Sequence, residues 1–166
     1  MRRILAGLGL LPPRDFELEM RHAVVLSLVS FALHFAWENV QCPLLYVHGS
    51  YDASWLGMVR ATSGDVLLTW SIYASVAVVS GRWRWDAEPW SARAWAVLVA
   101  AAIVLGIAVE VQALATGRWT YTPSMPVSPG LGVGLVPVAQ LLILTPGSIR
   151  LAARFARGPR TVSARR

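Results

Sequence analysis

Two side chains that could exchange a proton lie one helical turn apart in an apolar stretch of the chain. They are His34 and Glu38, in the segment from Leu33 to Gln41. Residues four apart share one face of an α-helix, so a helix here would bring the imidazole close to the carboxylate. Ionisable groups within an apolar span are costly and by default mark a functional site. A histidine and a carboxylic acid at this spacing are typical of general acid–base chemistry.

The composition indicates which elements must position this pair. Of the 166 residues, 55% are hydrophobic and only 14% are charged, and the mean hydropathy is +0.52. Soluble domains carry about 25% charged residues. A membrane span needs about 20 mainly apolar residues, and the chain has four such runs. We therefore predict an all-α fold with four transmembrane helices in one bundle, and the predicted spans cover residues 21–41, 63–81, 91–115 and 130–149. They form a single domain over residues 1–157, followed by a basic tail, 158–166, that we expect to be disordered.

Local signals set the expected ends of these spans. Pro43 is expected to end the first span, because the residue before a proline avoids the helical conformation. Ser63 is predicted to cap the start of the second span and Gly81 to stop it. In the fourth span, Pro137 and Pro146 each remove a backbone hydrogen bond, which predicts a kink.

Arginine is unevenly distributed among the segments that connect the spans. All 15 basic residues are arginines, and all but Arg60 and Arg118 fall in the N-terminal segment, the loop between spans two and three, or the C-terminal tail. Positive loops stay in the cytoplasm, so we predict a multi-pass protein of the cell inner membrane with both termini cytoplasmic (N-in/C-in). The arginines form no stripe beside a binding motif, which argues against nucleic acid as a partner. Residues 1–13 are expected to be a retained segment on the membrane surface, because no small-x-small cleavage site follows them.

With this topology, three carboxylates in different spans fall at the same depth, toward the outer leaflet. Glu38 lies near the outer end of the first span, Asp65 opens the second, and Glu110 approaches the outer end of the third. Acids scattered for unrelated reasons are not expected to share one depth. A polar stripe at helical spacing is predicted to face them from the first span, and it comprises Ser27, Phe31, His34, Glu38 and Gln41. The candidate ligand-binding residues that accompany this cluster are Trp37, Asn39, Thr69, Trp119, Tyr121 and Gln140.

The second outer loop, residues 116–129, alternates polar and aromatic residues before three prolines. This pattern predicts an extended, stiff segment instead of a helix. Two interpretations stay open. The loop is either a lid over the outer ends of the helices or an aromatic hairpin at the membrane interface.

Three interpretations of the acidic cluster also stay open. The first is structural, with carboxylates that cap helices or hydrogen-bond neighbouring spans. The second, our preferred functional hypothesis, is acid–base chemistry on a hydrophobic ligand that enters from the bilayer. In it, His34 and Glu38 act as proton donor and relay, while Asp65 and Glu110 act as base or cation stabilisers. The third is a metal site built from the same four residues, although the stripe has no second histidine. We expect no bound metal and no other cofactor.

The order of these residues resembles the EXPERA family of membrane proteins, which includes the emopamil-binding sterol isomerases and the sigma-2-type receptors. The resemblance rests on His34-x-x-x-Glu38, on Gly64-Asp65 at the start of the second span, on Glu110 and on a polar amide in the fourth span. It implies membrane helices around a cavity for sterol-like or cationic amphiphilic ligands. In the isomerases, a double bond is moved by protonation and by removal of a proton elsewhere. The resemblance further implies that His34, Glu38 and Asp65 match the family's histidine and acids, whereas the fourth span departs from the pattern, since it has Gln140 and no tryptophan.

A second resemblance covers residues 110–140, which are similar in rhythm to membrane lycopene-cyclase-like proteins. The positions that carry it are Glu110, Gly117-x-Trp119-x-Tyr121 and Pro137-x-x-Gln140. Those proteins carry acids where this chain has Gln140. Both resemblances imply an isoprenoid-type ligand and proton chemistry, so we expect a site that binds, isomerises or cyclises such a ligand. The alternative is a non-catalytic accessory subunit of a larger membrane complex. The expected partners are the lipid bilayer and a hydrophobic small molecule, with a homo-oligomer or a larger complex as further options.

Overall fold

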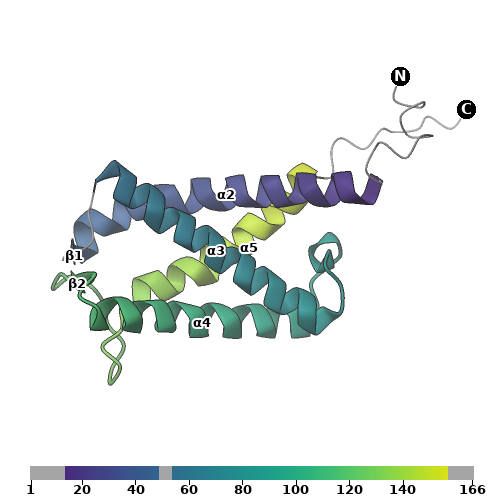
Figure 1. Ribbon diagram of the computed structural model, residues 1–166. Coiled ribbons are helices and arrows are strands. Elements are labelled where there is room, and N and C mark those ends of the chain that lie inside the picture. The colour runs from purple at the N-terminus through teal and green to yellow at the C-terminus, as the bar shows by residue number, and fades with distance from the viewer. Residues whose placement is uncertain (1–13, 49–53, 157–166) are drawn as a thin grey trace, which may run out of the picture.

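Four long helices make up almost all of the structure, a computed structural model that describes residues 14–48 and 54–156. They are α2 (Arg14–Leu45), α3 (Trp55–Ser80), α4 (Ala92–Ala115) and α5 (Leu135–Ala156). Each contains a stretch that is long and apolar enough to cross a membrane. The predicted all-α bundle of four transmembrane helices is therefore confirmed (Figure 1). The predictions for the N-terminal segment, 1–13, and for the tail, 158–166, lie outside the described residues.

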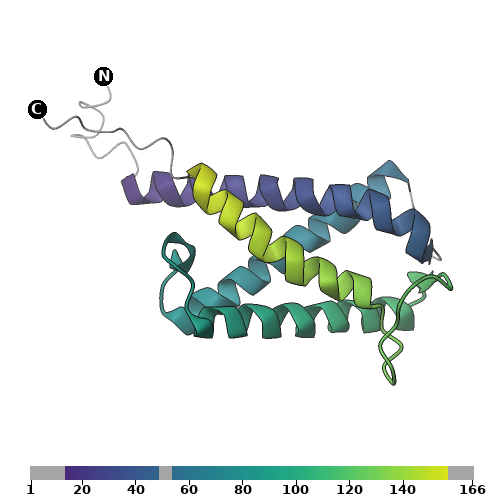
Figure 2. The same ribbon diagram turned by 180° about the vertical axis from the view of Figure 1, so that it is seen from behind.

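Helices α2 and α4 lie along opposite sides of the bundle, and α3 and α5 run obliquely between them and cross. Figures 1 and 2 show this arrangement from the two sides. At one end, β1 (Tyr46–His48) pairs antiparallel with β2 (Trp119–Tyr121), and Tyr46 lies opposite Tyr121. We call this the strand end. At the other end, the short 3-10 helix η1 (Trp85–Ala87) lies between α3 and α4, and we call this the η1 end.

Helix α2 is longer than the predicted span at both ends. It continues through Pro43 to Leu45, so the prediction that Pro43 ends the helix is wrong by two residues. A proline removes only one helical hydrogen bond, and the last carbonyls of a helix lack helical partners in any case. Here the side-chain hydroxyl of Thr122 donates to the Leu44 carbonyl at 2.9 Å, and its backbone N–H donates to the Leu45 carbonyl at 3.0 Å. These bonds stabilise the extra turn.

Helix α3 begins eight residues before the predicted start of the second span. Its N-cap is Ser54, whose side chain accepts a hydrogen bond from the backbone N–H of Gly57. Ser63 was predicted to be this cap, but it lies inside the helix and donates to the Val59 carbonyl at 2.7 Å. The predicted stop is confirmed, because Gly81 caps the helix in the left-handed conformation with φ 67°.

The last two helices differ in how well the sequence predicts them. Helix α4 agrees with the prediction to within one residue, and Ser91 caps its start. Helix α5 was predicted to begin at Gly130, but Gly130 and Gly132 have φ values of 84° and 64° and form a turn. The helix begins only at Leu135, so Pro137 lies in its first turn, where no helical partner is lost. At its other end α5 continues past residue 149 to Ala156.

The buried face of α2 matches the predicted stripe from His34 onward but is shifted by one position in the part before it. His34, Glu38 and Gln41 are buried as predicted, but Ser27 and Phe31 are only half-buried. Their places are taken by Leu26 and Ser30, which are fully buried. A helix that packs on both α3 and α5 buries the residues facing the line between these neighbours, and hydrophobicity alone does not fix that rotation.

Candidate functional site

A buried hydrogen-bond network joins α2 to α5 near the strand end, and Glu38 is its acceptor. The side-chain amides of Gln41 and Gln140 donate to Glu38 Oε1 at 2.8 and 3.0 Å. The thiol of Cys42 donates to Glu38 Oε2 at 2.9 Å. Gln41 also donates to the Gln140 carbonyl oxygen at 2.7 Å. Because α2 remains helical beyond residue 41, Gln41 and Cys42 lie on the same face as Glu38, one turn farther along.

His34 belongs to the same network, one turn deeper in the bundle. Its Nδ1 lies 2.9 Å from the Gln140 amide nitrogen and 3.6 Å from Asp65 Oδ2. Its Nε2 lies 3.5 Å from the Thr69 hydroxyl, which in turn accepts a hydrogen bond from Ser30 at 3.1 Å. His34, Ser30 and Thr69 are fully buried. The predicted relay from His34 to Glu38 is therefore bridged, because Gln140 contacts both groups.

Gln140 has more acceptors around it than its amide group can serve. Its nitrogen lies within 3.2 Å of His34 Nδ1, Glu38 Oε1 and Asp65 Oδ2. A primary amide carries only two N–H hydrogens. Glu38 Oε1 also accepts from the Gln41 amide, so the two hydrogens of Gln140 can serve the other neighbours.

The second acid, Glu110 on α4, lies under the paired strands. It accepts hydrogen bonds from the Trp119 indole at 3.3 Å, from the Tyr46 hydroxyl at 3.5 Å, and from the Tyr121 hydroxyl. The Tyr121 oxygen also accepts the backbone N–H of Gly134 at 2.9 Å. Burial and the adjacent Glu110 carboxylate hold the pKa of Tyr46 well above its usual range. Burial and the hydrogen bond to Glu110 do the same to the pKa of Tyr121, so both phenols remain proton-carrying donors.

The two strands bring residues from both loops at the strand end over this acid. The Tyr46 ring packs edge-on against Trp119, with 5.6 Å between the ring centroids, and against Tyr121, with 5.8 Å. In the loop of residues 116–129, the stretch from Trp119 to Tyr121 is extended, as predicted, but its partner strand comes from the other loop. This pairing argues against a self-contained hairpin and favours the interpretation of the loop as a lid.

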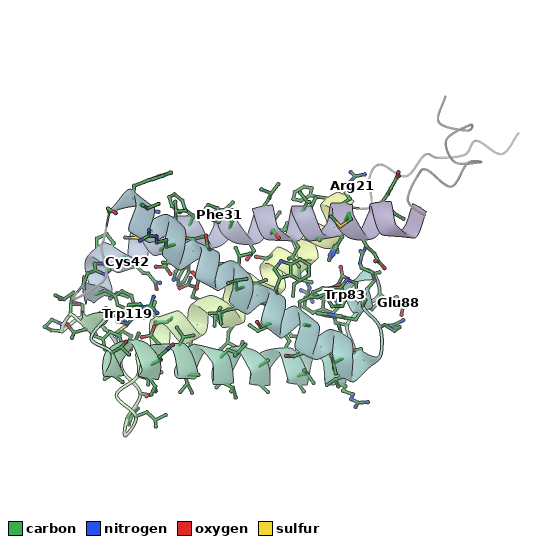
Figure 3. All side chains as sticks on the ribbon, in the orientation of Figure 1. Arg21, Phe31, Cys42, Trp83, Glu88 and Trp119 are labelled. Carbon is green, nitrogen blue, oxygen red and sulfur yellow. The ribbon has the colours of Figure 1, made fainter. Side chains whose placement is uncertain are left out.

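A cavity of about 330 Å³ lies between the two acidic groups. The polar part of its wall includes the acids Glu38, Asp65 and Glu110 together with Gln41, Gln140, His48, Gln112, Arg60 and Arg118. The apolar part of the wall includes Leu67, Leu68, Val109, Pro137 and Leu141. The volume lies within the range of small-molecule sites, about 300–1,000 Å³. Figure 3 shows the position of the cavity through Cys42 and Trp119, which both line it at the strand end.

Most of the residues selected from the sequence lie at this cavity. Glu38, Asp65, Glu110, Trp119 and Gln140 line it. His34 and Tyr121 contact lining residues from behind, and Thr69 contacts His34.

Trp37 and Asn39 are the exceptions, because neither of these predicted ligand-binding residues lines the cavity. Trp37 donates to the side chain of Gln41 at 2.8 Å. Asn39 is exposed and donates to the Phe35 carbonyl of its own helix at 2.7 Å. Successive helical positions differ by about 100° in direction, so neither neighbour of Glu38 can share its face.

Sequence reasoning missed two residues of the site, Cys42, which binds Glu38, and Tyr46, which binds Glu110, and it placed Gln41 on the buried stripe without selecting it for the site. The spacing of Gln41 and Cys42 from Glu38 was available as a signal, whereas Tyr46 depends on a strand pairing between distant loops. No three His, Cys, Asp or Glu side chains among the described residues are grouped as a metal ion requires.

Fold and site together define a multi-pass membrane protein with an acidic cavity at one end of its helix bundle. No protein-family model, curated protein or solved structure matches the chain. The resemblances to the EXPERA and lycopene-cyclase-like families therefore stay predictions that rest on the residues quoted for them.

Proposed function

We propose that the cavity at the strand end binds a hydrophobic isoprenoid- or sterol-like molecule and isomerises or cyclises it by acid–base chemistry. One observation carries the proposal. Two buried carboxyl groups from different helices, Glu38 and Glu110, face the same cavity, and much of the remaining wall is apolar. An apolar wall with a few convergent polar groups is the usual form of a site for a small hydrophobic ligand.

The chemistry needs one proton to enter the ligand and one to leave. A carboxylic acid donates its proton to one carbon of a double bond, and the resulting carbocation loses a proton from a neighbouring carbon to a second carboxylate. The double bond has then moved. If a second double bond of the ligand first attacks the carbocation, a new carbon–carbon bond closes a ring and the resulting cation loses the proton. Neither route needs an oxidant or a reductant. In this proposal His34 and Glu38 act as proton donor and relay, while Asp65 and Glu110 act as base or cation stabilisers.

The aromatic residues at the strand end suit a cationic intermediate. Trp119 lines the cavity, and Tyr46 lines it next to Trp119. The faces of aromatic rings attract a cation, and the attraction grows when water is excluded. The paired strands β1 and β2 would exclude water from the ligand and so protect the carbocation from capture.

The proposal includes an orientation in the inner membrane. All arginines except Arg60 and Arg118 lie in segments joined to the η1 end, which favours cytoplasmic termini. The cavity would then open toward the outer leaflet, and a lipid-soluble substrate would enter it from the bilayer.

Mass spectrometry of gently solubilised protein, followed by organic extraction of the same sample, tests the proposal. We expect a bound isoprenoid- or sterol-like molecule at close to one copy per chain in the wild type, and a lower occupancy in Glu38→Gln. Glu88→Gln is the matched control, because Glu88 is an exposed acid at the opposite end. A stoichiometric partner protein with no extracted ligand would support the alternative, an accessory subunit of a larger membrane complex.

A further inference from the structure

The η1 end holds a second hollow, separate from the acidic cavity. Its volume is about 290 Å³, and it lies between the segment that contains η1 and the last turns of α5. Two acids, Asp86 and Glu88, and two arginines, Arg150 and Arg154, line it together with Trp90. The question is which of these charges remain available to a ligand.

Both acids already have partners. Asp86 is held by the His22 ring at 2.9 Å, by the Tyr73 hydroxyl at 2.8 Å and by the Arg84 side chain at 3.1 Å. Its burial favours the neutral acid, but the hydrogen bonds from His22, Tyr73 and Arg84 outweigh burial and lower the pKa of Asp86 to about 2. Glu88 is paired with Arg82 at 2.9 Å. Neither acid is therefore left to neutralise the arginines of α5.

The two arginines lie one helical turn apart on α5, and Arg150 is the one that stacks on aromatic rings. The guanidinium of Arg150 stacks over the rings of Trp90 and Trp95, at 4.7 and 5.1 Å from their centroids. Stacking uses the face of the guanidinium and leaves its edge of N–H donors to bind an acceptor. Within residues 14–48 and 54–156, neither Arg150 nor Arg154 forms an ion pair with a carboxylate. Among the described residues, Arg150 and Arg154 therefore add unpaired positive charge to the hollow, and the stacking on Trp90 and Trp95 holds the Arg150 guanidinium in place.

The depth of this hollow points to the source of the ligand. Trp83, Trp90 and Trp95 gather at the η1 end, and tryptophan is enriched at the level of the lipid head groups. The exposed side chain of Phe155 follows Arg154 on the last turn of α5. An anion that reaches this hollow from the bilayer would be a lipid phosphate, and guanidinium groups bind phosphate oxygens through paired hydrogen bonds.

We propose that Arg150 and Arg154 bind a phosphate group in this hollow, and that the phosphate belongs to the head group of an anionic phospholipid. The proposal is independent of the acid–base chemistry at the strand end. Free inorganic phosphate has the same recognition chemistry, so the experiment includes it as a separate ligand.

Native mass spectrometry of the full chain tests the site, after reconstitution with phosphatidylglycerol or with phosphatidylcholine. The wild type is expected to retain one phosphatidylglycerol, with at least tenfold preference over phosphatidylcholine. Arg150→Gln and Arg154→Gln are each expected to reduce this retention at least tenfold. Arg93→Gln is the matched control, an exposed arginine at the same end that does not line the hollow, and it should retain the lipid as the wild type does.

The remaining outcomes separate the sources of the phosphate and the ways in which the proposal can fail. Millimolar inorganic phosphate should not displace the phosphatidylglycerol. If it does, and if the protein shows no preference between the two lipids, the site belongs to soluble phosphate and the lipid assignment is overturned. An equal loss of phosphatidylglycerol retention in all three variants, Arg93→Gln included, would mean that the lipid is attracted by positive charge in general, and would overturn a specific site. Retention unchanged in both Arg150→Gln and Arg154→Gln would overturn the site itself. Since Arg154 is exposed, Arg154→Gln keeps the test valid even if loss of the Arg150 stacking affects folding.

Discussion

The side-chain amide of Gln140 donates to Glu38 Oε1 across 3.0 Å and so ties α5 to α2 inside the bundle. The same amide lies 2.9 Å from His34 Nδ1 and 3.2 Å from Asp65 Oδ2. One neutral residue thus connects a histidine and two acids that come from two other helices.

Removing this connection should destabilise the fold. Gln140→Leu keeps most of the side-chain volume but removes one of the donors to Glu38 Oε1 and the amide contact of His34 Nδ1, which costs about 1–3 kcal/mol. We expect the free energy of unfolding in detergent to fall by that amount. Gln112→Leu is the control, because Gln112 is exposed on α4 and its replacement should change the free energy by at most about 0.5 kcal/mol. Equal stability of the two variants would contradict a central role for Gln140.

Gly134 sets the position of Tyr121 beside Glu110. A Cβ added at Gly134 would lie 3.1 Å from the Tyr121 ring and 3.1 Å from Met125 Sδ. Gly134→Ala should therefore displace Tyr121 from Glu110 and lower the free energy of unfolding by about 1–3 kcal/mol, the usual cost of overpacking. Gly147→Ala has no atom within 4 Å of the added carbon and should cost nothing. Thermal unfolding of the two variants checks the contrast, and a smaller loss in Gly134→Ala than in Gly147→Ala would refute it.

The Asp86 cluster predicts a specific pH dependence of stability. The pKa of Asp86 in the folded protein is about 2, below its usual value, because the bonds from His22, Tyr73 and Arg84 outweigh the effect of burial. A lowered pKa contributes stability above the unfolded pKa of about 4, and this contribution is lost as the pH falls toward 2. We expect Asp86→Asn to be less stable than the wild type by about 2–3 kcal/mol at pH 7.

The same difference should shrink as the pH is lowered from about 4 to about 2, because protonation of Asp86 removes its ionic bonds in the wild type as well. Unfolding measured across this range, with Glu88→Gln as the control for an exposed acid, provides the check. A gap between wild type and Asp86→Asn that stays constant down to pH 2 would show that the carboxylate charge contributes nothing.

The sequence predicts the four helices well because hydropathy over a membrane span is a strong signal. Their ends are less predictable, since capping depends on contacts such as those of Thr122 with the end of α2. Ser63 satisfies the residue preference of an N-cap, but the apolar face of α3 begins earlier, so the helix also begins earlier. The fourth span was predicted to begin at Gly130, although Gly130 and Gly132 adopt positive φ in a turn.

The site was partly predictable for the same reason. The topology predicted from the sequence places Glu38, Asp65 and Glu110 at the same membrane depth, and the structure brings all three around one cavity. Asn39 was included and Cys42 was not, although helical spacing alone places Cys42, four residues on, and not the adjacent Asn39 on the face of Glu38. The contact of Tyr46 with Glu110 depends on strands from two loops, and no periodicity along the chain reports such a pairing.

Deuterium transfer from D₂O to a bound ligand is the most direct test of acid–base chemistry in the cavity. Purified protein would be incubated in D₂O with lipid extracted from the membranes in which it was produced, and the isoprenoid- and sterol-like fraction would be analysed by mass spectrometry. Protonation of a double bond by an exchangeable acid places deuterium on carbon, so the wild type and Glu88→Gln should both label a ligand. Glu38→Gln should reduce the labelling at least a hundredfold, within the usual range for loss of a general acid, about 10²–10⁴. Labelling that is absent in the wild type, or unchanged in Glu38→Gln, would contradict the proposed chemistry.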